Sequence, residues 1–191
     1  MRNQTGLGAA LLLVLVACGS APTTHFHSLM PAPGTGAARA AAKGWELLPV
    51  SVPVQVDQPQ WVIRQPDDTL AVLENERWAA PLGDEIRAAL AERLRERLPA
   101  LRHAAGWRIA IDVQRFDSLP GQRAHVEAEW SLRAADATGA ALRCRSVSDE
   151  PATAGYAALA AAHRVALQRL GDTLADALNA LDQGRPAACG R

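Results

Sequence analysis

The sequence predicts an α+β fold, a single domain in which two long helices pack on one face of a mostly antiparallel sheet. Three observations support this prediction. Several segments alternate apolar and polar residues, as strands with one solvent-exposed face do. Two other segments repeat apolar residues every three or four positions, which is typical of amphipathic helices. The expected elements follow the order of four strands, a helix, three strands and a helix, which favours helices gathered on one face of the sheet.

The first part of the predicted domain contains four strands. One covers residues 24–31 and a second covers residues 45–54, where two prolines confine the strand to a sheet edge or a bulge. A stretch of small residues between them is expected to form a loop. Residues 61–64 and 69–74 are rich in β-forming residues and flank a Pro-Asp-Asp turn, which predicts a hairpin.

A first helix is predicted over residues 81–101. Asp84 and Glu85 lie near its start, where negative charge interacts favourably with the helix dipole, and Pro99 helps to end it. Its apolar residues recur at every fourth position: Leu82, Ile86, Leu90, Leu94 and Leu98.

Three strands and a second helix complete the domain. The strands cover residues 107–116, 123–135 and 141–150, and their alternation predicts antiparallel strands with one wet face. The helix covers residues 155–181. Its apolar stripe consists of Tyr156, Leu159, His163, Leu167, Leu170, Leu174, Leu178 and Leu181.

The N-terminus predicts a lipoprotein signal. An uncharged apolar run over residues 7–17 follows a single arginine, and it is too short for a membrane-spanning helix, which needs about 20 apolar residues. The run ends in Leu-Val-Ala-Cys, the order of a bacterial lipobox, so Cys18 is the expected site of lipid attachment. Several acyl chains on one residue would give firm anchoring. The competing interpretation is a cleaved signal in which the cysteine is incidental.

These features divide the chain into four parts. Residues 1–17 are the expected signal peptide and residues 18–23 the lipidated tether. Residues 24–182 form the α+β domain, which is long enough to bury a proper core, and residues 183–191 form a C-terminal tail.

Charge and cysteine content narrow the possible functions. Lysine plus arginine and aspartate plus glutamate both number 20, and a chain with this balance lacks the basic surface of a nucleic-acid-binding protein. Lipidation of one cysteine leaves Cys144 and Cys189, which are a candidate disulfide in an oxidising compartment. The alternative is that Cys144 is a core thiol. The two cysteines are too far apart in sequence to suggest a zinc pair.

The sequence contains few candidates for chemistry. No nucleophile elbow, zinc-protease, P-loop or dinucleotide-binding pattern is present. His25 and His27 share a strand face and could bind a metal, but a third ligand is missing nearby, so no metal site is expected. His163 lies on the apolar helix stripe and is expected to be a core histidine bonded to a backbone carbonyl.

One strand carries a second polar set. His125, Glu127 and Glu129 line the same face and could form an acid and base pair. Because this is the polar face of an alternating strand, a solvated surface is the expected role. We therefore expect no enzyme activity and no cofactor.

The segment from Val52 to Leu90 resembles the ABC-type transport auxiliary lipoproteins, the family that contains paraquat-inducible protein C. These proteins carry a lipobox, a segment of the form VP-x-x-LDRPQ-x-V-x-R, a hairpin, and a block RWAEPL that opens a helix. The first block is matched here by Val52, Pro53, Asp57, Pro59, Gln60 and Arg64, and the second by Arg77, Trp78, Ala79, Pro81 and Leu82. The chain departs from the pattern at Val56, Gln58 and Ala80, and Phe26 is the only aromatic residue in the first strand.

The resemblance implies a non-catalytic accessory of a transport system. Such lipoproteins lie on the outer membrane, anchored by lipid and facing the periplasm. They work with an MCE-domain periplasmic protein in moving phospholipid or other hydrophobic molecules between membranes, in support of envelope integrity. Self-association into a homo-oligomer is plausible for such a component.

The two motif blocks suggest different roles. Asp57, Pro59 and Gln60 lie in an exposed connection, where recognition residues concentrate, and with Arg64 they are the expected partner contacts. Trp78, in the block with Arg77, Pro81 and Leu82, is expected to fill the core at the helix entry.

Two other classes remain open at this point. A lipoprotein chaperone or pilotin would share the anchor and the fold, but would bind an outer-membrane assembly factor. A lipoprotein hydrolase would need a pocket that gathers His125, Glu127 and a nucleophile.

Overall fold

The structure is a computed structural model that describes residues 22–31, 44–98, 100–137 and 141–189. The expected signal peptide, Cys18 and most of the tether lie outside the described residues, as does most of the predicted loop after the first strand.

Elements follow each other in the predicted order of four strands, a helix, three strands and a helix. They are β1 (His25–His27), β2 (Trp45–Leu47), β3 (Gln60–Arg64), β4 (Leu70–Trp78), α1 (Leu82–Arg97), β5 (Trp107–Leu119), β6 (Arg123–Ala134), β7 (Leu142–Pro151) and α2 (Tyr156–Asp182). The α+β class predicted from the sequence is confirmed, and the β3–β4 hairpin closes at the Pro-Asp-Asp turn.

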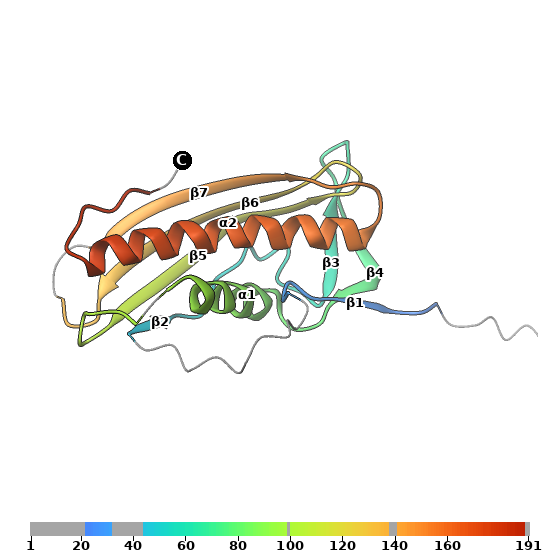
Figure 1. The fold of residues 1–191 in the computed structure, drawn as a ribbon. Coiled ribbons are helices and arrows are strands. Elements are labelled where there is room, and N and C mark those ends of the chain that lie inside the picture. The colour runs from blue at the N-terminus through green and yellow to red at the C-terminus, as the bar shows by residue number, and fades with distance from the viewer. Residues whose placement is uncertain (1–21, 32–43, 99, 138–140, 190–191) are drawn as a thin grey trace, which may run out of the picture.

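The strands form two sheets where the sequence suggested one. Sheet A has the order β1-β4-β3, and sheet B has the order β2-β5-β6-β7 (Figure 1). The long strands pair antiparallel, as predicted, but β1 runs parallel to β4 and β2 runs parallel to β5. The β2 strand lies at a sheet edge, which agrees with the prolines that follow it.

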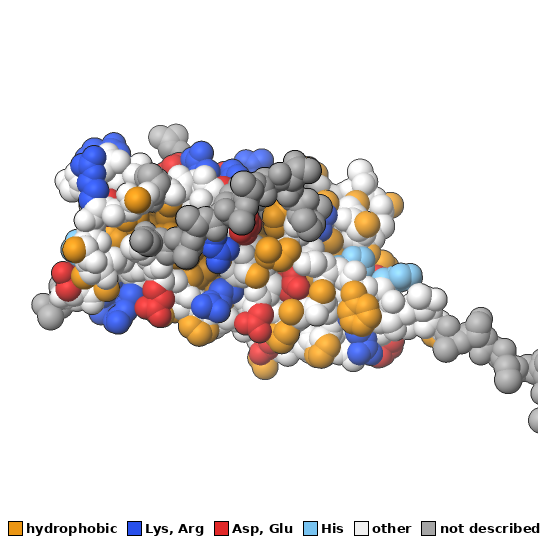
Figure 2. Space-filling view, turned by 60° about the horizontal axis from the view of Figure 1, so that its bottom comes forward, with side chains coloured by type: hydrophobic (Ala, Val, Ile, Leu, Met, Phe, Trp, Pro, Cys, Tyr) orange, Lys and Arg blue, Asp and Glu red, His pale blue; other side chains and the backbone are white. Residues whose placement is uncertain are grey.

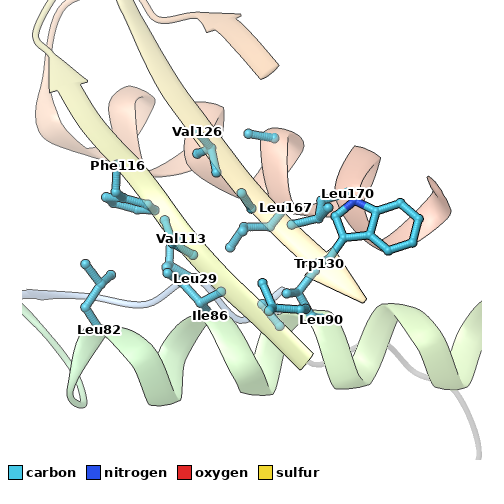
Figure 3. Close-up of a cluster of buried hydrophobic side chains, with 14 of the residues drawn as sticks. Leu29, Leu82, Ile86, Leu90, Val113, Phe116, Val126, Trp130, Leu167 and Leu170 are labelled. Atoms are coloured by element: carbon cyan, nitrogen blue, oxygen red, sulfur yellow. The ribbon is translucent and has the colours of Figure 1, made fainter. Parts of the chain in front are cut away.

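Both helices cover one face of sheet B (Figure 1). Alternate residues of β5 and β6 face the helices and are almost fully buried, whereas their neighbours face solvent. Figure 3 shows the core between these layers, formed by Leu82, Ile86 and Leu90 of α1, Val113 and Phe116 of β5, Val126 and Trp130 of β6, and Leu167 and Leu170 of α2. No helix in the described ranges has both the length and the apolar content that crossing a membrane requires.

The two helices touch at a glycine. A Cβ atom on Gly171 of α2 would lie 2.7 Å from Cγ of Arg93 of α1, so a larger residue would push the helices apart. Arg93 then donates two hydrogen bonds to Asp172, at 2.8 and 2.9 Å. This pair holds the solvent side of the helix contact.

A bulge partway along β5 changes which of its side chains face the core. The pairing with β6 shifts between Val113 and Arg115, so Phe116 returns to the core. The strand continues to Leu119, beyond its predicted end, and Asp117 and Ser118 are buried. The simple alternation read from the sequence is therefore correct only up to the bulge.

The C-terminal segment is fixed to sheet B. Cys144 of β7 and Cys189 form a disulfide with their Cα atoms 5.2 Å apart, as expected from the cysteine count. At the end of α2, Asp182 accepts hydrogen bonds from the backbone of Arg102 and His103. Both contacts tie the last helix and the tail to the rest of the domain.

Candidate functional site at the motif strands

The two motif blocks meet in sheet A although they lie far apart in the sequence. Gln60 of β3 is paired directly with Arg77 of β4, and Arg77 is paired on its other side with Phe26 of β1. The backbone of Pro59 accepts a hydrogen bond from the N–H of Trp78 at 3.1 Å. The fold thus assembles a row of three residues, Phe26, Arg77 and Gln60, which we call the motif row.

The loop before β3 presents further residues beside this row. Asp57 and Pro59 are exposed, and Val54 is 87% exposed. Val56 is 7% exposed and anchors the loop to the core. No hydrogen bond or ion pair is made by the side chains of Asp57 and Gln60 with the described part of the chain, so both are available to a partner.

The exposed end of β1 adds an apolar side chain to this surface. Phe26 is 67% exposed, which is unusual for a phenylalanine in a strand. In Figure 2, hydrophobic side chains lie beside pale blue histidines at the end of the molecule where the N-terminal chain leaves. Phe26 was considered in the sequence only for its departure from the family pattern, and its pairing with Arg77 depends on the tertiary structure.

Arg64 has an internal role that the sequence does not show. Its Nε and Nη2 donate to Oδ1 of Asp117 at 3.3 and 3.0 Å, and its Nη1 donates to the backbone oxygen of Asp68 at 3.2 Å. Asp117 lies after the bulge of β5. Arg64 therefore joins the β3–β4 hairpin to sheet B, and a contact with a partner stays a prediction.

Trp78 lies in the core, as its position before the helix suggests. It is 4% exposed and packs against Trp61, with ring centroids 4.4 Å apart, and edge-on against Phe116. Pro81 is the N-cap residue of α1, and Leu82, its first residue, is 1% exposed. This block fixes the junction between sheet A and the first helix.

A buried polar chain lies behind the tryptophans. Nε1 of Trp61 donates to Oγ of Ser118 at 2.8 Å, and Oγ of Ser118 lies 2.8 Å from Nε2 of His163. His163 stacks on Phe116 with ring centroids 4.0 Å apart. The histidine is a core residue, as predicted, but its partner is a hydroxyl and not a backbone carbonyl, because the bulge turns Ser118 inward.

This serine and histidine pair is unsuited to catalysis. Ser118 and His163 are 1% and 0% exposed, so no substrate reaches them. Burial lowers the pKa of His163 to about 3, so the imidazole is neutral and a weak base at neutral pH. The geometry indicates a structural hydrogen bond between β5 and α2.

His25 and His27 share one carboxylate of a neighbouring strand. Nδ1 of His25 lies 3.0 Å from Oε1 of Glu76, and Nε2 of His27 contacts Oε2 of the same residue. Burial disfavours ionisation of Glu76, but the hydrogen bonds with His27 and His25 outweigh burial and hold its pKa below the usual value. The cluster ties β1 to β4. Within the described ranges, no group of three or more histidine, cysteine or acidic residues is arranged to hold a metal ion.

The polar face of β6 forms ion pairs with β7. His125 contacts Asp149 at 3.0 Å, and Glu127 pairs with Arg145 at 2.7 Å. Glu129 is exposed on the same face. These residues are spread along the strand, and no serine or cysteine of the described part of the chain is bonded to them, so this geometry gives the hydrolase interpretation no support.

The chain matches a known protein family over most of its length. The family model for the ABC-type transport auxiliary lipoprotein component matches residues 27–175. No curated protein sequence is significantly similar to the chain.

Solved structures share the fold. One, a crystal structure of an uncharacterized protein, has a TM-score of 0.66 at 16% identity and covers 81% of this chain and 97% of its own. Another, a Xanthomonas campestris protein of the family DUF330, has a TM-score of 0.62 at 21% identity and covers 85% of this chain and 96% of its own. At these identities the likeness concerns the fold alone.

Proposed function

Since the chain belongs to the ABC-type transport auxiliary lipoprotein family, we propose that it is the non-catalytic, lipid-anchored accessory of an MCE-type transport system. It would lie on the periplasmic side of the outer membrane and bind an MCE-domain protein of the system that moves lipid between membranes. The observation that supports this proposal best is the motif row, where both blocks of the family resemblance meet at the half-buried Gln60 and Arg77, beside the exposed Phe26.

The position of this surface fits a membrane-anchored component. The lipobox would place acyl chains on Cys18, seven residues before β1. Seven residues span at most about 25 Å when fully extended. Sheet A and its motif row would therefore lie close to the membrane, at the end of the domain where the N-terminal chain leaves (Figure 1).

The chemistry of the surface also fits a docking role. The motif row combines an exposed aromatic ring with an arginine and an amide, and the loop beside it adds an exposed carboxylate. Interfaces are commonly built from an aromatic or arginine centre with a polar rim. The residue after the lipidated cysteine also fits an outer-membrane location. Gly19 follows Cys18, in place of the aspartate that retains lipoproteins at the inner membrane.

Two experiments test the proposal. Metabolic labelling with a palmitate analogue should mark the wild-type protein, and Cys18→Ser should abolish the label and release the protein from the outer-membrane fraction. Unchanged labelling and fractionation in the variant would contradict the lipid anchor.

The second experiment tests the partner. The lipidated protein, crosslinked in native membranes and purified, should carry the MCE-domain protein of the same cell. Recovery of a β-barrel or a secretin in its place would favour the chaperone or pilotin function.

A further inference from the structure

The solvent-exposed face of sheet B carries an arginine pair that opposes the stability of the sheet. Arg108 of β5 and Arg133 of β6 are directly opposite each other in the pairing of the two strands. Like charges at opposed positions on neighbouring strands destabilise a sheet. Arg143 of β7 is opposite Ser131, which lies two residues before Arg133 on β6 and faces the same side of the sheet.

Few carboxylates neutralise these arginines. Arg108 contacts Glu46 at 3.6 Å, and the two side chains are 57% and 64% exposed, so this pair is weak. The side chains of Arg133 and Arg143 are exposed and contact no carboxylate of the described ranges. By contrast, Arg145 on the same strand is paired with Glu127 at 2.7 Å. The three arginines thus form a local cationic cluster on a chain with no net charge.

A hollow of about 600 Å³ lies beside the cluster. Its floor is made of small side chains, Ala110 and Ser131, which are opposite each other in the β5–β6 pairing. Leu48 and Pro49 form an apolar wall, and two carboxylates that are opposite each other, Asp112 and Glu129, line the end away from Arg108. The hollow therefore has a floor of small side chains, positive charge at the end near Arg108 and negative charge at the other end.

We propose that this hollow, together with Arg108, Arg133 and Arg143, binds an extended segment of a partner protein that places acidic side chains over the arginines. The inference rests on the proposed function, because it assigns a second contact surface to the same accessory. An apolar side chain of such a segment would lie against Leu48 and Pro49, and its acidic side chains would neutralise the opposed arginines, of which only Arg108 contacts a carboxylate in the described ranges.

The location favours a protein over a membrane surface. The arginines lie at the end of sheet B where β5 begins, whereas β1 and the N-terminal chain lie at the opposite end (Figure 1). A strand of 13 residues spans about 40 Å. Electrostatic attraction to lipid is screened over about 8 Å at physiological ionic strength, so a membrane at the anchor end would not reach this cluster. A hollow also accommodates a chain segment better than it accommodates a flat membrane surface.

Charge reversal separates binding from stability. Arg133→Glu creates an opposite-charge pair with Arg108, so it should raise the melting temperature by about 1–4 °C. The same variant should lose affinity for an acidic segment. A residue with only a structural role would not show higher stability together with lost binding. An unchanged or lower melting temperature would show that the arginine pair is not strained.

The first probe is a synthetic peptide of alternating glutamate and valine. Its binding is measured by NMR of the isotopically labelled full-length protein. Wild type should show shifts at backbone amides of β5, β6 and β7 around the hollow. The double variant Arg133→Glu with Arg143→Glu should bind about tenfold more weakly or worse. Arg185→Glu makes a single charge reversal on the exposed tail and should bind within about twofold of wild type. No shifts with wild type, or equal affinity in the double variant, would overturn the inference.

The second probe is the purified MCE-domain protein, and it separates this inference from the proposed function. If wild type and the double variant bind it equally, the hollow is not the contact surface although the proposed function stands. If wild type binds the peptide but not the MCE-domain protein, the hollow stands and the proposed function fails. Co-sedimentation with phosphatidylglycerol vesicles that depends on Arg133 and Arg143, or a crosslink from Ser131 to a second copy, would overturn the choice of a partner segment.

Discussion

Sheet B is built mainly from three long strands whose sequence pattern specifies them, whereas sheet A combines one longer strand, β4, with the shorter strands β1 and β3. In sheet B, β6 and β7 alternate regularly, β5 alternates up to its bulge, and the three strands bury one face under the two helices. In sheet A, β1 has three residues and the pairing of β3 with β4 shifts between Gln60 and Trp61. Sheet B supplies most of the strand residues of the core, and sheet A carries the motif row.

This difference shows where the protein can tolerate change. Sheet A is attached to the core through Trp61, Trp78 and the Ser118–His163 hydrogen bond, all of them buried. Phe26 on its outer side and Asp57 in the loop before β3 are exposed and contribute little to the core. Substitutions at the junction should therefore affect stability, and substitutions on the outer surface should affect binding.

The largest effect is expected at the junction of the two sheets. Trp78→Ala should lower the free energy of unfolding by about 3–5 kcal/mol, because it leaves a cavity beside Trp61. Phe26→Ala is the matched control, since it removes an aromatic ring that is 67% exposed, and it should change stability by about 0.5 kcal/mol or less. Urea unfolding of both variants checks the comparison. Equal losses would show that sheet A is as tightly packed at its surface as at its junction.

The next effect concerns the edge of sheet B. Cys189→Ala should lower the free energy of unfolding by about 3–4 kcal/mol in the chain-entropy model, because the disulfide closes a loop of 45 residues. The variant leaves Cys144 in the core as a free thiol. Reductant should destabilise wild type by a similar amount and leave Cys189→Ala unchanged. Two free thiols in non-reducing mass spectrometry of the mature wild type would contradict the bridge.

A smaller effect is expected from the pH dependence of His163. Its folded-state pKa of about 3 lies below the ordinary value of 6.5, so the unfolded chain binds more protons than the folded chain between these values. The stabilisation is complete above pH 6.5 and is lost as the pH falls toward 3. Between pH 7 and pH 5, wild type should lose about 2 kcal/mol through this group, before most carboxylates titrate.

His163→Gln should flatten this part of the pH profile, whereas His103→Gln, at a histidine that is 33% exposed, should leave it in place. Urea unfolding at pH 7, 6 and 5 measures the slopes, so the comparison does not depend on the absolute stability of either variant. A wild-type profile that is flat over this range would contradict a neutral buried imidazole.

The smallest effect on stability is expected on the outer surface of sheet A. Asp57→Ala combined with Gln60→Ala should change the free energy of unfolding by about 0.5 kcal/mol or less, because neither side chain has a partner in the described ranges. The same double variant should weaken co-purification with the MCE-domain protein. Normal capture by this variant would move the interface away from the loop, and a large loss of stability would show that the loop is part of the core.

The sequence predicted the elements better than it predicted their pairing. Apolar periodicity indicated both helices and the three long strands, because each pattern reports which face of a segment is buried, and β-forming residues around a Pro-Asp-Asp turn indicated the hairpin. It could not show that β1 joins β4 or that β2 joins β5, since strands of three residues carry too short a pattern to select a partner some 50 to 60 residues away. The composition also favoured the pairing of Cys144 with Cys189, because few cysteines were available.

The candidate sites divide in the same way. By itself, the sequence identified the motif blocks, the lipobox and the buried role of Trp78, because these depend on local residue order and hydrophobicity. Only the tertiary structure placed Gln60 beside Arg77 and Phe26, turned Ser118 inward at the bulge, and opposed Arg108 to Arg133. Each of these contacts depends on the register between strands, which is set by packing across the whole domain and not by any segment alone.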